Sequence, residues 1–122
     1  MNRPKILVID DEEMMFTLLK VTLTPMGFDF IRGSQMEDFN TLIEREHIDA
    51  LILDYLMPKK NGLQVAEEIR SKTPKLPIVL MTSKQMTTEE TKLLMALNLD
   101  YVRKPFVPQV FSGKLREILA RS

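Results

Sequence analysis

The sequence contains no cysteine and a single histidine, His47, among its 122 residues. Without cysteine, the chain cannot carry a disulfide scaffold, a cysteine-ligated zinc site or thiol catalysis. One histidine leaves no histidine-rich metal site and argues against a Ser-His-Asp triad. We interpret His47 as a solvated turn residue near the end of the second predicted helix.

An excess of charge of one sign is also missing. Lys and Arg number 17, as do Asp and Glu, so the formal net charge is zero. This balance argues against a generic basic nucleic-acid binder, and we expect no direct nucleic-acid partner. No apolar run approaches the roughly 20 residues of a membrane span, and the N-terminus does not resemble a signal peptide. We expect a cytoplasmic protein with one domain over residues 1–122.

Three short apolar runs are continuous rather than alternating, which is typical of parallel strands buried on both faces of a sheet. They span residues 6–9, 50–53 and 78–81, and weaker runs at 28–31 and 101–102 predict two further strands. Between the runs, apolar residues recur at helical spacing and predict five helices. The residues with this spacing are Met15, Leu18, Leu19 and Leu23; Met36, Phe39, Leu42 and Ile43; Leu63, Val65, Ala66 and Ile69; Leu93, Leu94 and Leu97; and Val110, Phe111, Leu115, Ile118 and Leu119.

This alternation of strands and helices predicts a doubly wound α/β fold, because right-handed crossovers between parallel strands place helices on both faces of the sheet. Ligands of such sheets bind beyond the carboxyl ends of the strands. Polar residues that directly follow the strands are therefore the candidates for a site. They are Asp10, Asp11, Asp54, Thr82, Ser83 and Lys104, the last followed by Pro105.

Each candidate has a simpler structural interpretation when it is taken alone. The acidic run 10–13 could cap and charge the start of a helix, and a lone aspartate after a strand is commonly a turn residue. Thr82 alone suggests a helix N-cap, and Lys104 alone a solvated lysine. Their joint placement at one sheet edge favours a site over these separate interpretations.

The combined side chains suit phosphoryl chemistry. Clustered carboxylates raise one another's pKa by repulsion, and a hard cation such as Mg²⁺ relieves that repulsion beside a phosphoryl group. A carboxylate can attack phosphorus to form an aspartyl phosphate. Hydroxyl, ammonium and backbone N–H groups can donate hydrogen bonds to the transferred oxygens.

Four motifs, in order and in register over nearly the whole chain, resemble the signatures of the CheY-like response-regulator receiver domain of bacterial two-component signalling. They are Val8–Glu12, Leu53–Pro58 with Gly62, Met81–Ser83 and Tyr101–Phe106. The resemblance implies a flavodoxin-like (βα)5 fold, with a five-stranded parallel sheet in the order 2-1-3-4-5 and helices on both faces.

The resemblance also implies the roles of the acidic residues. Asp54 would be the phosphoacceptor. A Mg²⁺ ion would be bound by Asp54, directly by Asp11, largely through water by Asp10, and by the backbone carbonyl of Leu56.

Other residues would act on the phosphoryl group or respond to it. Lys104 would contact the phosphoryl oxygens, and the Lys104–Pro105 bond is a candidate cis peptide. Thr82 would move toward the phosphoryl group on activation, with Tyr101 as the coupled aromatic switch. Ser83 replaces the usual Ala or Gly, so its hydroxyl narrows access or adds a donor.

Two further departures concern the fourth helix and the phosphoryl lifetime. Leu97 replaces the usual glycine and is followed by Asn98, which tolerates a left-handed conformation, so the helix end is expected to shift. Residues two past the aspartate and two past the threonine, here Leu56 and Lys84, are expected to control the attack of water.

The leading hypothesis is therefore a phosphorylation-activated signalling switch rather than an enzyme with turnover. It would accept a phosphoryl group from a histidine kinase or phosphotransfer protein. It would then control a downstream protein, or dimerise, through the surface of the fourth helix, fifth strand and fifth helix. Both a stand-alone chemotaxis-type regulator and a receiver excised from a longer regulator fit the sequence.

Two alternatives belong to other functional classes. A phosphatase of the haloacid-dehalogenase type also uses an aspartate nucleophile with Mg²⁺, but it needs an acid two residues later, where this chain has Leu56. A degenerate receiver would act only as a binding module, although all the expected acid, hydroxyl and lysine positions are occupied here.

Overall fold

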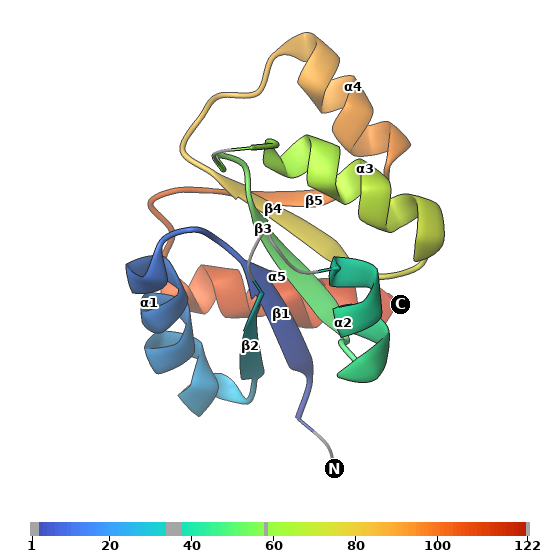
Figure 1. Ribbon diagram of the computed structural model, residues 1–122. Coiled ribbons are helices and arrows are strands. Elements are labelled where there is room, and N and C mark those ends of the chain that lie inside the picture. Colours follow the sequence, from blue (N-terminus) through green and yellow to red (C-terminus); the bar gives the residue numbers. More distant parts are fainter. Residues whose placement is uncertain (1–2, 34–37, 58, 122) are drawn as a thin grey trace.

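The computed structural model describes residues 3–33, 38–57 and 59–121. Within these ranges, five parallel strands form one sheet in the order β2-β1-β3-β4-β5 (Figure 1). The predicted fold class and the strand order that the resemblance implied are confirmed. The strands are β1 (Lys5–Ile9), β2 (Asp29–Gly33), β3 (Ala50–Asp54), β4 (Ile78–Thr82) and β5 (Asp100–Arg103).

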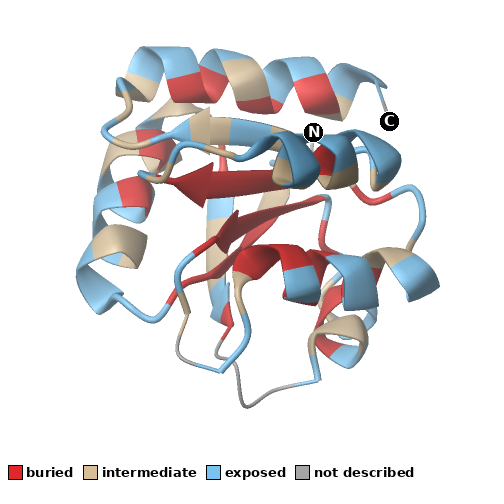
Figure 2. Ribbon diagram, turned by 90° about the horizontal axis from the view of Figure 1, so that it is seen from above, coloured by how far each residue is buried: buried red, intermediate tan, exposed pale blue. Residues whose placement is uncertain are grey.

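Helices cover both faces of the sheet, and Figure 2 shows the buried strands between two helical layers. Helices α1 and α5 pack on one face, and α2, α3 and α4 on the other. The helices are α1 (Glu13–Leu23), α2 (Phe39–Arg45), α3 (Gly62–Lys72), α4 (Thr88–Ala96) and α5 (Pro108–Arg121), with a short 3-10 helix, η1 (Thr24–Met26), after α1.

The alternation of side chains along each strand divides the core into two parts. In β1, Leu7 and Ile9 pack with α2 and α3, whereas Ile6 and Val8 pack with α1 and α5. Because both faces are covered, the three central strands need continuous apolar sequence. Edge strands β2 and β5 are partly exposed, which explains their weaker signal in the sequence.

Local signals in the sequence fix the helix ends. Asn61 and Thr87 form capping boxes at the starts of α3 and α4, and each box satisfies backbone N–H groups that the helix leaves unpaired. At the end of α4, Asn98 takes the left-handed conformation with φ 55°, which confirms the expected shift of the cap. His47 is exposed with φ 54°, in agreement with its interpretation as a turn residue.

Strand β2 differs from the prediction, since it spans 29–33 rather than 28–31. Phe28 precedes the strand and is buried against the α1/α5 side of the core instead. Met36, part of the second predicted helix, and Pro58, part of the second motif, lie outside the described residues. None of the helices within the described ranges is long and apolar enough to cross a membrane.

Candidate functional site

The carboxyl ends of the strands bring four predicted residues to one edge of the sheet. Asp54 and Thr82 are the last residues of β3 and β4, Asp10 follows β1, and Lys104 follows β5. Asp10, Asp54 and Thr82 are 2%, 3% and 1% exposed. The Lys104 Nζ atom donates a hydrogen bond to Asp54 Oδ1 at 3.2 Å, so a cation already neutralises the buried carboxylate.

Asp10 is the member of this group whose carboxylate is least well satisfied. Its Oδ1 accepts a hydrogen bond from the Glu12 backbone N–H at 2.7 Å, but its buried Oδ2 has no hydrogen-bond partner among the described residues. The pKa of the Asp10 carboxyl is raised from 3.8 to about 6, chiefly by burial and also by the neighbouring Asp54 carboxylate, although the hydrogen bond from the Glu12 backbone N–H lowers it. A buried oxygen without a donor is suited to bind a cation.

Carboxylate oxygens of Asp10, Glu12 and Asp54 lie within 4.8 Å of one another. Three hard oxygen donors with one unpartnered atom fit a Mg²⁺ ion. Glu12 was not predicted as a ligand, although it lies in the acidic run that drew attention to this edge. Asp11, assigned as the direct ligand by resemblance, is exposed and is not part of this group of described residues. Its role stays a prediction.

The structure does not support the interpretation of Glu12 and Thr82 as side-chain helix caps, or of Lys104 as a solvated lysine. Glu12 is the N-cap residue of α1 but makes no side-chain capping bond. Thr82 does not cap α4, because Thr87 does; its Oγ1 accepts from the Lys84 backbone N–H at 2.9 Å instead. Lys104 is not a solvated lysine, since its side chain is only 18% exposed.

The remaining predicted residues surround this pocket. The Leu56 and Ser83 side chains are exposed, and Tyr101 lies on β5 with 37% exposure. The Lys104–Pro105 peptide bond is cis, which confirms that prediction. The ligand role of the Leu56 carbonyl and the switching roles of Thr82 and Tyr101 stay predictions.

Gly62 holds the chain tightly behind Asp54. Its backbone N–H donates to the Tyr55 carbonyl oxygen at 2.8 Å. A Cβ atom at this position would lie 2.5 Å from the Asp54 carbonyl oxygen and 2.6 Å from Leu80 Cδ1. Only glycine allows this close approach between the start of α3 and the end of β3, so Gly62 helps to fix the position of Asp54.

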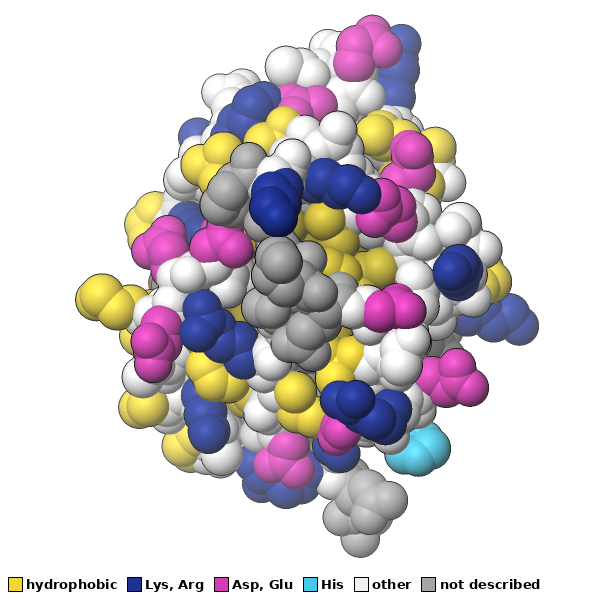
Figure 3. All heavy atoms as spheres, viewed as in Figure 1, with side chains coloured by type: hydrophobic (Ala, Val, Ile, Leu, Met, Phe, Trp, Pro, Cys, Tyr) yellow, Lys and Arg dark blue, Asp and Glu magenta, His cyan; other side chains and the backbone are white. Residues whose placement is uncertain are grey.

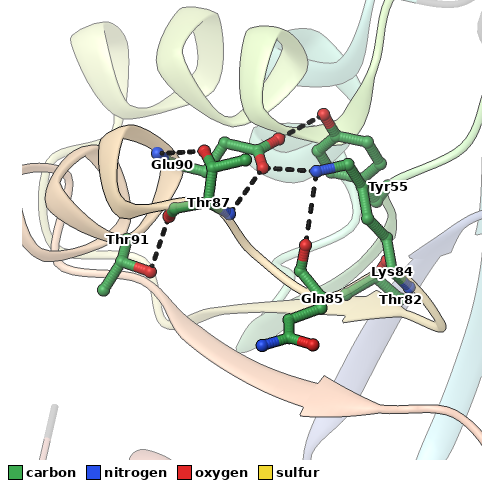
Figure 4. A network of polar contacts seen from close by, with 7 residues as sticks. All are labelled: Tyr55, Thr82, Lys84, Gln85, Thr87, Glu90 and Thr91. Carbon is green, nitrogen blue, oxygen red and sulfur yellow. Dashed lines mark hydrogen bonds and ion pairs between the residues drawn. The ribbon is translucent and has the colours of Figure 1, made fainter.

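A second polar cluster, which the sequence did not predict, adjoins the pocket (Figure 4). Glu90 of α4 accepts hydrogen bonds from the Tyr55 hydroxyl at 2.5 Å and from the Lys84 ammonium at 2.5 Å. Its carboxylate also accepts from the Thr87 backbone N–H at 2.9 Å. We call Tyr55, Lys84 and Glu90 the α4 clamp. Tyr55 is 35 residues from Glu90 and Lys84 is six residues from it, and the spacing of these residues did not predict that they would meet.

Comparison with known proteins assigns a class to this fold and site. The family model of the response regulator receiver domain matches residues 6–116. The chain belongs to this family, whose members bind Mg²⁺ at an acidic pocket, act as signalling switches, and interact with histidine kinases and downstream effectors.

Two relatives show different contexts for such a domain. The chain is 38% identical to the Alkaline phosphatase synthesis transcriptional regulatory protein PhoP of Bacillus subtilis, covering 100% of this chain and 50% of that protein. It is 34% identical to a Chemotaxis protein CheY homolog of Campylobacter jejuni, covering 94% of this chain and 92% of that protein. The chain thus spans about half the length of the first relative and nearly all of the second.

Solved structures agree with the fold. A putative response regulator from Chloroflexus aurantiacus is 28% identical, with a TM-score of 0.84 over 99% of this chain and 100% of that chain. A two-component response regulator from Clostridium difficile is 26% identical, with a TM-score of 0.85 over 98% of each chain.

Proposed function

We propose that this chain is a phosphorylation-activated switch that accepts a phosphoryl group on Asp54 from a histidine kinase or phosphotransfer protein. The observation that carries the proposal is the Asp54 carboxylate itself. It is buried at the end of β3, paired with Lys104 at 3.2 Å and adjacent to the unpartnered Asp10 Oδ2. Such a carboxylate is held rigidly and shielded from competing water.

In the transfer step, an Asp54 carboxylate oxygen attacks phosphorus of a phosphohistidine. The new P–O bond forms as the P–N bond breaks, and the imidazole leaves with the electron pair and takes up a proton. Lys104 is placed to stay with the transferred group, because its ammonium can move from the carboxylate to a phosphoryl oxygen. Thr82 supplies a hydroxyl at the same edge.

We infer that Mg²⁺ is held by Asp10, Asp11, Asp54 and the Leu56 carbonyl, with Glu12 as a further carboxylate within reach. When bound, the ion neutralises negative charge on the transferring phosphoryl oxygens. The protein's own part is to hold these oxygens together at the strand ends despite their mutual repulsion.

The test is labelling with acetyl phosphate and Mg²⁺, followed by mass spectrometry. We expect slow, stoichiometric addition of one phosphate, which is absent in Asp54→Asn and retained in Asp29→Asn, a control at an exposed aspartate of β2. Stoichiometric labelling of Asp54→Asn would contradict the proposal. Multiple turnover would indicate a phosphatase, and the absence of labelling in the wild type a degenerate receiver.

An apolar face on α1 is suited to dock the phosphodonor protein. Met14, Leu18 and Val21 are exposed there, and apolar side chains are visible along the left edge of Figure 3, where α1 lies. The helix begins at Glu13, directly after the acidic run. A protein seated on this face would therefore have a phosphohistidine within reach of Asp54.

The output surface is proposed to be formed by α4, β5 and α5, where Met95, Tyr101 and Val107 are exposed. It would bind a downstream protein or a second copy of the chain. The phosphoryl group carries about −1.5 to −2 charge and three acceptor oxygens, in place of the single charge of the Asp54 carboxylate. These oxygens draw Thr82 inward and leave space for Tyr101.

A beryllofluoride adduct, which mimics the phosphoryl group, should perturb NMR signals of Thr82, Tyr101 and α4. Thr82→Ala should reduce the distant changes while leaving Asp54 modifiable. Shifts confined to the acidic pocket would show that signalling does not use this surface.

We propose that residues 1–122 are one receiver domain acting in the cytoplasm. The Campylobacter relative supports a stand-alone regulator, and the longer Bacillus relative supports a receiver within a larger regulator. The sequence of the full-length gene decides between these two contexts.

A further inference from the structure

Two residues of the α4 clamp adjoin residues of the phosphorylation site. Tyr55 is the residue directly after Asp54, and Lys84 is held by its backbone N–H on Thr82 Oγ1 at 2.9 Å. The Lys84 ammonium also lies 5.5 Å from the centre of the Tyr55 ring. The Glu90 carboxylate thus gathers donors from the end of β3, from the β4–α4 loop and from the N-terminus of α4.

We propose that Glu90 is a positioning residue for the response to phosphorylation. It holds the Lys84 ammonium on α4 in the unmodified protein, and a phosphoryl group on Asp54 competes for the same ammonium. The inference rests on the proposed function, because it needs phosphoryl acceptance at Asp54. Transfer of Lys84 from Glu90 to the phosphoryl group would break the ion pair that joins the β4–α4 loop to the first turn of α4.

The charges favour this exchange. The phosphoryl oxygens on Asp54 carry about −1.5 to −2 charge in place of the single charge of the free Asp54 carboxylate, against a single charge on Glu90. The Lys84 side chain is long, flexible and 36% exposed, so it can reorient without unpacking the core.

Glu90 can release Lys84 without being left unpaired. Its two oxygens keep the Tyr55 hydroxyl and the Thr87 N–H as donors. The Lys84 hydrogen bond, followed by those of Thr87 and Tyr55, lowers the pKa of Glu90 to about 2. Glu90 is therefore an anion at neutral pH, and its attraction for Lys84 is present whenever the protein is unmodified.

The experiment measures the affinity of beryllofluoride with Mg²⁺ by NMR titration in four variants. Glu90→Gln removes the charge but keeps the capping box, since glutamine also serves at this position. We expect it to bind beryllofluoride at least threefold more tightly, because Lys84 is released beforehand. Glu89→Gln removes the same charge from an exposed neighbour in the same turn and should bind as the wild type does.

Lys84→Gln removes the ammonium group that is proposed to move between Glu90 and the phosphoryl group. Lys84 is partly exposed and does not contribute to the core. We expect it to bind beryllofluoride at least threefold more weakly than the wild type. In the double variant Lys84→Gln/Glu90→Gln, the increase in beryllofluoride affinity that Glu90→Gln causes should disappear. A purely structural role of Glu90 would not predict this loss.

The possible failures are distinct. If the wild type forms no beryllofluoride adduct, the proposed function fails. If the adduct forms but Glu90→Gln binds as the wild type does, the inference is overturned. An equal gain in Glu89→Gln, or a gain that persists without Lys84, would overturn it as well.

Discussion

Asp10→Asn should stabilise the protein at neutral pH. Asp10 is buried, and burial raises its pKa to about 6, which means that the folded protein resists its ionisation. Asparagine has nearly the same shape, can keep the acceptor for the Glu12 N–H and never ionises. With about 1.4 kcal/mol per pKa unit, a shift of about two units predicts that Asp10→Asn gains about 3 kcal/mol at pH 7.5.

The pH dependence follows from the sign of the shift. The pKa of Asp10 is higher in the folded protein than in the unfolded chain, where it is about 3.9. The folded state therefore binds more protons between these values. The contribution of Asp10 to stability is fully present below about pH 4 and is lost as the pH rises through about 6. The advantage of Asp10→Asn should grow over the same interval and level off above about pH 7.

The assay is urea unfolding followed by circular dichroism from pH 4.5 to 8, without divalent cations. Asp29→Asn, at an exposed residue whose ion pair with Arg3 lies on the surface, should change stability by less than about 1 kcal/mol. Added Mg²⁺ should stabilise the wild type more than Asp10→Asn. A variant no more stable than the wild type at pH 7.5, or a difference independent of pH, would refute the reasoning.

Three further outcomes are expected. Gly62→Ala should destabilise the fold by about 1–3 kcal/mol in urea unfolding, since its Cβ would lie 2.5 Å from a backbone oxygen. Leu56→Asn should lose its phosphoryl group faster than the wild type in a radiolabel decay assay, because an amide can position the attacking water. Equal or slower decay of the variant would contradict this. The hydrogen bond to Glu90, burial and the charge of Glu90 together raise the pKa of Tyr55 to about 12, so Glu90→Gln should lower this pKa, which ¹³C-tyrosine NMR can measure.

Sequence patterns predicted the parts of this fold that depend on burial alone. The runs that became β1, β3 and β4 are apolar because both faces of each strand are covered, so the signal does not depend on the neighbouring strand. β2 was placed one residue too early, because Phe28 is as apolar as a strand residue yet fills the core before the strand begins. The strand order came from the resemblance, since periodicity does not determine which strands pair.

In the site, too, some residues were predictable from the sequence and others were not. Asp10, Asp54, Thr82 and Lys104 were predictable because topology alone brings strand ends together. The grouping of Glu12 with the aspartates depends on how the chain turns into α1, and the acidic run does not reveal it. Contacts of Glu90 with Tyr55 and Lys84 depend on the path of the β4–α4 loop, which side-chain spacing does not encode.

Helix α4 is anchored differently from the other helices of the described chain. It buries only Leu94, whereas α3 buries Gly62, Leu63, Val65, Ala66 and Ile69. Local opening costs less where fewer apolar groups must be exposed to solvent. Amide protons of α4 should therefore exchange with deuterium faster than those of α3, well before global unfolding. On this expectation, the helix that carries the proposed output surface is the one that opens at a smaller free-energy cost than α3.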